Sequence, residues 1–365
     1  MSAKQTRSSV RTVFAGLLRH QIMIPIAALL LLTLFNLILD RSFFSVTLAH
    51  NASGDPVLQG NLISILDNGS ELAILAIGMT LVTAASGGQD ISVGACIAVS
   101  GSAILRVLCG TDPHPETMQT SIFVAFLVGC FAAMMCGAFN GALVAFFRLQ
   151  PMVATLILFT AGRSIAAWFN NNQLPFISDP SFGYYGGYIP GIPIPTPALI
   201  ALICFIVIWA ALKFTNLGLY VQSVGINEKT SRLNGLNPAL IKLAVYIILG
   251  LCVGVCGLIK VSRNSTINYS VIAKDIEMDA ILAVALGGNA LSGGKFSMSA
   301  SILGAYVLQF LTTTLYKMEI QSTAISAYKA VVVIILVVCS APAVREKVSR
   351  LMNKLRMRRQ SGSTA

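Results

Sequence analysis

Apolar stretches long enough to cross a lipid bilayer recur along most of this chain. A membrane-spanning helix needs about 20 consecutive apolar residues, because lipid offers no hydrogen-bond partners and the helix must satisfy its own backbone. About ten stretches fit, and the third, sixth and eighth are short or bounded by glycine: Ile22–Leu39, Leu62–Ala85, Ile91–Cys109, Ile122–Phe147, Val153–Phe169, Ala198–Leu212, Ile241–Val261, Asp279–Leu291, Met298–Leu315 and Ile325–Val344. The sequence therefore predicts an all-α polytopic membrane protein with about ten transmembrane helices.

The composition supports this class against two soluble domains. Hydrophobic residues make up 55% of the 365-residue chain and charged residues 11%, and the mean hydropathy is +0.78. Such a chain needs membrane lipid around it. The net charge of +11 does not indicate nucleic acid, because Lys and Arg collect at the two ends and between apolar runs rather than on one surface.

The basic residues also predict the orientation of the chain. Both end segments, 1–21 and 345–365, are rich in Lys and Arg, and such segments stay in the cytoplasm. We therefore expect both termini inside and a transmembrane domain over 22–344 with an even number of crossings. The 213–240 loop then falls on the cytoplasmic side, and the Pro-, Gly- and Tyr-rich 170–197 loop falls outside.

An internal repeat is visible around two glycine-rich interruptions. Ala73–Ile77 (AILAI) precedes Ser86–Gly88 (SGG), and Ala280–Val284 (AILAV) precedes Ser292–Gly294 (SGG). Duplicated halves with glycine-broken helices are typical of transporters.

Polar residues in these interruptions are the candidates for a translocation pathway. A carboxylate near the bilayer centre costs roughly 2.5 to 3.5 kcal/mol, so Asp90 is expected to face protein or a water-filled path. Asp90 and Ser92 could equally cap the next helix, and the two roles are compatible. The residues expected near the pathway are Gly87, Gly88, Asp90, Ser92 and Asn289.

The second interruption, Leu286–Ser297, does not match a phosphate-binding loop. Such a loop needs Gly, four residues, then Gly-Lys-Ser/Thr. Here Asn289 stands at the first glycine position and Phe296 follows Lys295. We therefore expect no nucleotide or other cofactor on this chain, and any ATPase is another subunit.

Neither a catalytic nor a metal site is predicted. The three histidines, His20, His50 and His114, lie outside the apolar stretches. The eight cysteines lie in or beside apolar segments without metal-ligand spacing. Two small-xxx-small pairs, Gly137 with Gly141 and Gly250 with Gly254, predict closely packed helices instead.

The loop between the sixth and seventh stretches carries a short helix signal. Asn227 is a plausible N-cap for an amphipathic stretch ending at Leu233, Gly225 precedes it, and Gly235 is a stop signal. A solvated connector is the alternative. We favour a docking element for a cytoplasmic partner, because connectors of this length are often functional.

In order along the chain, these segments resemble the permease family of bacterial ABC importers for ribose, xylose, arabinose, galactose and related sugars. The resemblance covers Leu62–Val344 and is nearest to galactofuranose-type permeases. The matching segments are Leu72–Val82 (LAILAIGMTLV), Gly87–Ala95 (GGQDISVGA), Phe139–Leu156 (FNGALVAFFRLQPMVATL), Ala161–Arg163 (AGR), Val224–Asn237 (VGINEKTSRLNGLN) and Met278–Gly294 (MDAILAVALGGNALSGG). One departure is Gln89, where the family usually has an apolar residue.

The resemblance implies an assembly in the bacterial inner membrane. It contains a second permease chain, identical or related, a pair of cytoplasmic ATPase domains that bind ATP, and an extracytoplasmic sugar-binding protein. The resemblance also implies that the Gly225–Asn237 loop is the coupling helix that sits in a cleft of the ATPase. Its coupling residues are then Gly225, Asn227, Glu228, Lys229, Arg232 and Gly235. The same broad fold serves nucleoside and branched-chain amino-acid importers.

The leading hypothesis is a permease subunit that performs no chemistry on its sugar. The alternative is a secondary transporter or channel that uses Asp90 or Asp279 as an ion or proton site and needs no ATPase. A receptor or scaffold fits less well, because such proteins rarely carry paired broken helices.

Overall fold

The computed structural model describes residues 22–50 and 55–340. The basic segments at the two ends of the chain, 1–21 and 345–365, lie outside the described residues. So do the last residues of the expected stretch Ile325–Val344.

Each of the ten apolar stretches overlaps a helix. The long helices are α2 (Met23–Leu39), α3 (Asn61–Ser86), α4 (Val93–Cys109), α5 (Ile122–Ala145), α6 (Pro151–Phe169), α7 (Thr196–Phe214), α10 (Pro238–Asn264), α11 (Ile276–Leu286), α12 (Met298–Lys317) and α13 (Ser322–Ser340). Six of the described helices, α3, α5, α6, α7, α10 and α12, are long and apolar enough to cross a bilayer. The chain is therefore a multi-pass helical membrane protein, and the exact number of crossings stays a prediction.

Helix α3 is the centre of the bundle and α7 lies at its outside. In the most apolar 18-residue stretch of α3, 94% of the residues are buried, whereas in that of α7 only 17% are buried. Side chains of α7, α5 and α6 present large apolar surfaces outward, as lipid-facing helices do. Helix α3 packs on α7, α10, α11 and α12. It precedes the first glycine-rich interruption and contacts α11, which precedes the second.

The predicted small-xxx-small pairs bring α5 and α10 together. A Cβ atom at Gly137 would overlap the carbonyl oxygen of Tyr246 and lie 3.3 Å from the Cα of Gly250, and one at Gly254 would lie 2.7 Å from the Cα of Cys130. Only glycine permits backbones this close. The prediction of close packing is confirmed.

Helix α11 is much shorter than its neighbours. Its 11 residues rise only about 16 Å, roughly half the hydrocarbon thickness. The sequence predicted a stretch over Asp279–Leu291, but the helix ends at Leu286, because Gly288 has a left-handed φ of +72° that begins the glycine-rich turn.

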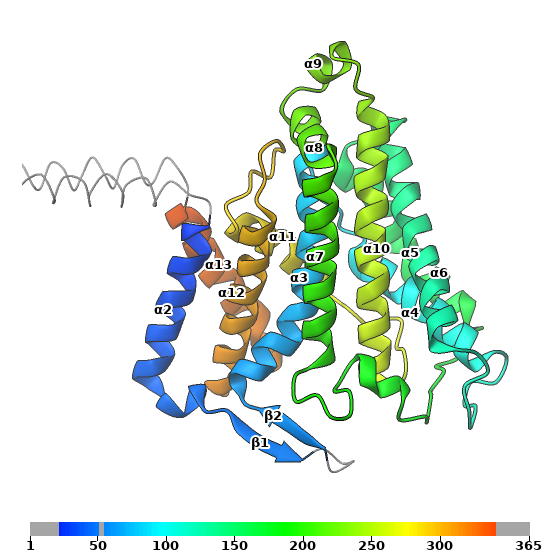
Figure 1. The fold of residues 1–365 in the computed structure, drawn as a ribbon, viewed down its shortest axis with the longest axis vertical. Helices are drawn as coiled ribbons and strands as arrows, with labels where there is room; N and C mark the ends of the chain where they lie inside the picture. The colour runs from blue at the N-terminus through cyan, green and yellow to red at the C-terminus, as the bar shows by residue number, and fades with distance from the viewer. Residues whose placement is uncertain (1–21, 51–54, 341–365) are drawn as a thin grey trace, which may run out of the picture.

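The two ends of the bundle differ (Figure 1). One end carries the antiparallel hairpin of β1 (Thr47–His50) and β2 (Pro56–Gln59), and we name it the hairpin end. The opposite end carries the short helix α9 (Glu228–Leu233), and we name it the α9 end.

The 170–197 segment lies at the hairpin end and is ordered, as predicted. It holds a 3-10 turn, η2 (Phe182–Tyr185), and buries the Phe182 side chain completely. The Tyr188 hydroxyl donates to the Leu58 carbonyl at 3.0 Å, and the Leu58 N–H donates to the Pro193 carbonyl at 3.2 Å. The segment is therefore attached to the hairpin.

The expected 213–240 loop is mostly helical. Beyond α9 it contains α8 (Leu217–Ile226), which the sequence did not predict, and α10 already begins at Pro238. Helix α8 has 10 residues, so a search for membrane-length apolar runs does not detect it.

Candidate functional site

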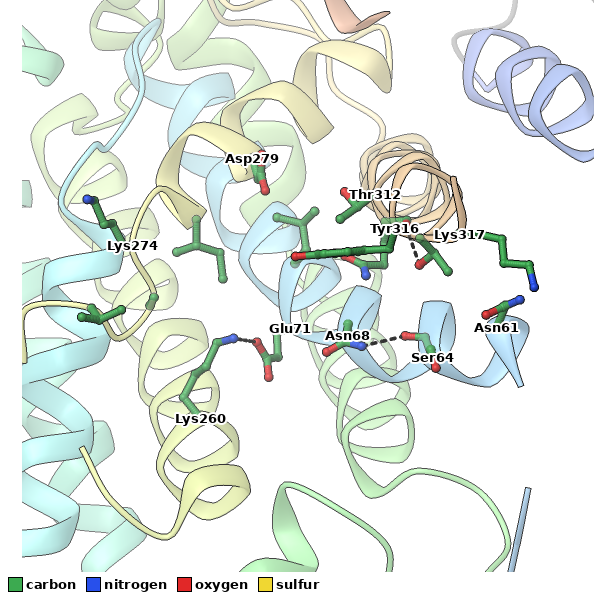
Figure 2. Close-up of a pocket in the computed structure, with 16 residues that line it drawn as sticks. Asn61, Ser64, Asn68, Glu71, Lys260, Lys274, Asp279, Thr312, Tyr316 and Lys317 are labelled. Carbon is green, nitrogen blue, oxygen red and sulfur yellow. Dashed lines mark hydrogen bonds and ion pairs between the residues drawn. The ribbon is translucent and has the colours of Figure 1, made fainter. Parts of the chain in front are cut away.

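A polar cavity of about 770 Å³ lies near the hairpin end, between α3, α10, α11 and α12 (Figure 2). Its lining is unusual for a membrane protein of this hydropathy, because most of the side chains are polar. They are Asn61, Ser64, Asn68, Glu71, Leu72, Lys260, Val271, Ala273, Lys274, Ile276, Asp279, Gln309, Thr312, Thr313, Tyr316 and Lys317. The cavity is large enough for a small solute.

The polar lining comes from two helical stripes. On α3, residues 61, 64, 68 and 71 are three or four positions apart, so their side chains share one face. On α12, residues 309, 312, 313 and 316 repeat the same spacing. The two stripes face each other across the cavity in Figure 2.

Most of the charged residues in the wall belong to ion pairs; the exception is Lys274, which has no carboxylate partner in the part of the chain that the structure describes. The buried Glu71 carboxylate lies 2.6 Å from Lys260 Nζ and 3.2 Å from an Arg263 nitrogen. Arg263 also pairs with Asp67 at 2.9 Å, so α3 and α10 are joined by two acids and two bases. Pairing lowers the cost of burying these charges.

On the other side of the cavity, two charged lining residues pair with residues outside the lining. Asp279 of α11 lies 2.6 Å from Lys329 of α13, and Lys317 of α12 lies 3.3 Å from Asp40. Serine, threonine, asparagine, glutamine and tyrosine side chains supply hydrogen-bond donors and acceptors between these pairs. The cavity is suited to a solute with many hydrogen-bonding groups.

Asp90 and Ser92 form a second polar cluster with Asn140 of α5. Asp90 Oδ1 accepts from the Ser92 backbone N–H at 2.7 Å and the Ser92 hydroxyl at 2.6 Å, while its Oδ2 accepts from Asn140 Nδ2 at 3.1 Å. All three residues are at most 2% exposed. Asp90 therefore turns the chain toward α4 and faces protein. The predicted capping by Ser92 is wrong, because Ser92 stands at the N-cap of α4 but its side chain makes no capping hydrogen bond.

The hydroxyl of Tyr246 and Oδ1 of Asn140 line a small cavity beside Asp90. Both atoms are buried and have no hydrogen-bond partner among the described residues. Asp90 also has no cationic partner in that part of the chain. The helix bundle therefore buries a cluster of polar groups, some of which have no hydrogen-bond partner among the described residues.

The two glycine-rich interruptions contact each other directly. A Cβ atom at Gly87 would lie 2.8 Å from the Ser292 carbonyl oxygen, and one at Gly293 would lie 3.1 Å from the Gly87 Cα. The Gly294 N–H donates to the Ala84 carbonyl at 2.9 Å. We call the backbone of Ala84, Gly87, Gly225 and Ser292–Gly294 the glycine junction.

Gly88 and Asn289 connect the two interruptions to neighbouring helices. Gly88 packs on Pro151 at the start of α6, where a Cβ atom would lie 2.7 Å from the proline ring. Asn289 Oδ1 accepts from the Ser297 N–H at 2.6 Å, and its Nδ2 donates to the Ser301 hydroxyl at 2.7 Å. Asn289 therefore holds the second interruption against the start of α12.

The five expected pathway residues thus lie either in the polar cluster around Asp90 or in the glycine-rich interruptions. The large cavity is a separate site. Asp90 and Ser92 are together, and Gly87, Gly88 and Asn289 shape the interruptions. None of the five belongs to the described lining of the 770 Å³ cavity, so their pathway role stays a prediction. The cavity was not predicted from the sequence, although the polar residues that line it recur at helical spacing in α3 and α12.

The segment of residues 225–237, which we name the docking segment, has the predicted cap, and its docking to a partner stays a prediction. Asn227 accepts from the Thr230 N–H at 3.1 Å and so begins α9, and Gly235 follows it with a left-handed φ of +79°. Glu228 lies 2.8 Å from Lys242 Nζ and 3.6 Å from Arg232. The hydrogen bond from Lys242 lowers the pKa of the Glu228 carboxyl.

A recess of about 510 Å³ surrounds this segment at the α9 end. Its lining combines three bases, one acid and an apolar side chain that is 87% exposed: Arg148, Lys229, Arg232, Glu228 and Leu233. Such an exposed mixture of apolar and charged groups is suited to a protein partner.

Comparison with known proteins places the chain in a family. Residues 61–341 match the family described as "Branched-chain amino acid transport system / permease component". The fructose import permease protein FruF of Bifidobacterium longum is 31% identical over 100% of this chain and 99% of the relative. The galactofuranose transporter permease protein YtfT of Escherichia coli is 34% identical over 85% of this chain and 86% of the relative.

The ribose import permease protein RbsC of Escherichia coli is 34% identical over 76% of this chain and 84% of the relative. No solved structure matches the chain. With a family match over most of its length and full-length relatives above 30% identity, this chain belongs to the family of membrane permease components of transport systems.

Proposed function

We propose that this chain is the membrane-spanning subunit of an ATP-driven importer and that it passes a sugar through the bilayer. The observation that carries the proposal is the 770 Å³ cavity lined by hydroxyl and amide side chains. A sugar presents many hydroxyl groups, and these match the hydrogen-bonding side chains of the wall. The fructose, galactofuranose and ribose permeases among the relatives support this substrate class.

The proposed orientation places the α9 end in the cytoplasm of a bacterial cell, because Arg148, Lys229 and Arg232 lie together in the connections at that end. The docking segment then faces a partner ATPase that binds and hydrolyses ATP. The hairpin end, with its 170–197 segment, faces an extracytoplasmic binding protein that delivers the sugar. A second permease chain completes the passage beside this one.

The cavity can be tested by removing hydrogen-bonding groups from its wall. We expect the Gln309→Leu/Thr312→Val double variant to slow ATP-dependent uptake of radiolabelled ribose, fructose or galactofuranose by about tenfold, since two neutral hydrogen bonds contribute roughly 1 to 3 kcal/mol together. Uptake is measured in cells that lack their own importer of that sugar and express the whole system.

Thr160→Val is the matched control. Thr160 also bonds to the carbonyl oxygen of its own helix at i−4, but its side chain lies on the exposed face of α6. Equal uptake by the double variant and the control, or uptake by this chain alone without ATP, overturns the proposal. The second outcome supports a secondary transporter instead.

A further inference from the structure

The two halves of the internal repeat contribute the same repeat position to the large cavity. Aligning Ala73–Ile77 (AILAI) with Ala280–Val284 (AILAV) places Leu72 of α3 and Asp279 of α11 at equivalent positions. Both residues line the 770 Å³ cavity. At this position the wall is therefore apolar in the first half of the repeat and acidic in the second.

Two carboxylates, Glu71 and Asp279, are among the described lining residues, and Glu71 has no oxygen available to a solute. Glu71 Oε2 lies 2.6 Å from Lys260 Nζ. Its Oε1 is buried and lies 3.2 Å from an Arg263 nitrogen. Both oxygens of Glu71 therefore face cations inside the wall.

Asp279 differs from Glu71 because one of its oxygens remains free. Its Oδ2 accepts from Lys329 Nζ of α13 at 2.6 Å, and its Oδ1 makes no hydrogen bond to residues 22–50 or 55–340. The Asp279 side chain is 25% exposed, against 3% for Glu71. Figure 2 shows Asp279 on the α11 side of the cavity, across from Glu71 of α3.

A carboxylate oxygen recognises a different group from the other polar atoms of the wall. It accepts hydrogen bonds and donates none, whereas the side chains of Gln309, Thr312 and Tyr316 can do either. Hydrogen bonds to a charged group are also stronger than those between neutral groups. Asp279 Oδ1 is therefore suited to a hydroxyl donor, and a sugar carries several.

We propose that Asp279 Oδ1 accepts a hydrogen bond from one hydroxyl group of the transported sugar and makes Asp279 a specificity-determining residue of the cavity. The inference rests on the proposed function, because it takes the sugar to pass through this cavity. It adds the group of the wall that recognises a hydroxyl donor. A derivative without that hydroxyl leaves the carboxylate oxygen unpaired and is transported more slowly.

The test compares two variants that both lack the Asp279–Lys329 ion pair. Lys329→Met removes the cation and keeps the carboxylate. Asp279→Leu/Lys329→Met also removes the carboxylate, places the residue type of Leu72 at the equivalent repeat position and leaves neither charge unpaired. The whole assembly is supplied with ribose, fructose or galactofuranose, whichever it imports, and with each monodeoxy derivative, at concentrations that saturate the binding protein.

We expect the unmodified assembly and Lys329→Met to transport one monodeoxy derivative about tenfold more slowly than the parent sugar, as for the loss of a hydrogen bond to a charged group. The double variant is expected to transport the two at nearly equal rates. The binding protein is the same in every assembly, so a difference between variants arises in this chain.

Asp279→Asn/Lys329→Met keeps the test decisive if the leucine variant does not fold. Its neutral amide oxygen is a weaker acceptor, and we expect it to slow the same derivative only about threefold. Thermal unfolding in detergent shows which variants are folded.

Discrimination by the carboxylate-free variants equal to that of Lys329→Met overturns the inference, as does equal transport of all derivatives by the unmodified assembly. Loss of discrimination in Lys329→Met as well assigns the effect to the ion pair and also overturns it. These outcomes leave the proposed function intact. Absence of ATP-dependent sugar uptake by the unmodified assembly overturns the proposed function instead.

Discussion

The backbone N–H of Gly294 donates a hydrogen bond to the carbonyl oxygen of Ala84 at a distance of 2.9 Å. Gly294 belongs to the second SGG interruption, and Ala84 lies in the last turn of α3, directly before the first one. The two interruptions of the internal repeat therefore meet in space. Their glycines permit the contact, because a Cβ atom at Gly87 or Gly293 would press on the opposite backbone. The repeat seen in the sequence is thus a paired structural element.

Asp90→Asn is expected to lower transport by about three- to tenfold, because the new amide N–H of residue 90 would face the Nδ2 of Asn140, where Asp90 now accepts a hydrogen bond. Expression and ATPase binding are expected to stay near normal. Uptake and co-purification are the measurements, and normal uptake by Asp90→Asn would show that turning the chain into α4 is the whole role.

The exchanged variant, Asp90→Asn with Asn140→Asp, separates packing from charge position. It restores a donor opposite an acceptor, so we expect thermal stability to recover. If transport recovers as well, the position of the carboxylate does not matter and the pathway role of Asp90 is excluded.

Glu71→Gln is expected to destabilise the protein by about 3 to 5 kcal/mol, because it leaves Lys260 and Arg263 short of a buried counter-charge. Adding Lys260→Met is expected to recover part of this loss. Thermal unfolding in detergent measures both. A Glu71→Gln variant as stable as the unmodified protein contradicts the ion-pair account of the α3–α10 contact.

Asn227→Ala is expected to cost α9 about 1 kcal/mol, since it removes the side chain that accepts from the Thr230 N–H. We expect weaker co-purification of the ATPase, and Asn227→Asp is expected to restore it because Asp caps equally well. Loss of binding in both variants means that the amide itself contacts the partner, and normal binding in Asn227→Ala shows that the cap is dispensable.

The ion pair between Glu228 and Lys242 is expected to make the docking segment sensitive to acid. The folded pKa of Glu228 lies below its usual 4.5, so the stabilisation is fully present above pH 4.5 and is lost as the pH falls through the lower folded value. Hydrogen exchange of α9, corrected for intrinsic rates, measures this. Glu228→Gln is expected to abolish the pH dependence, and an unchanged dependence assigns it to another group.

The helices were predictable because the bilayer imposes a length that apolar runs reveal directly. The cap at Asn227 was predictable because capping depends on residues adjacent in sequence. Helix α8 was not, because ten residues at a membrane face produce no run of membrane length. The end of α11 was misplaced, since Ala290 and Leu291 continue the apolar composition after the glycines have ended the helix.

The site was harder to predict than the fold. Asp90 was identifiable as an isolated carboxylate between apolar runs, but its partner Asn140 lies on another helix. The large cavity depends on four helices whose order in space no local pattern encodes. The polar stripes on α3 and α12 could be recognised in the sequence from their helical spacing. That the two stripes line the same cavity could not.

In the proposed assembly this chain forms the translocation pathway, and an ATPase on another chain drives transport. The most direct measurement is uptake of radiolabelled sugar into proteoliposomes that contain this permease with its co-purified partners and the binding protein. We expect sugar to accumulate only when ATP and the ATPase are both present. Accumulation driven by this chain alone in ATP-free liposomes would contradict it.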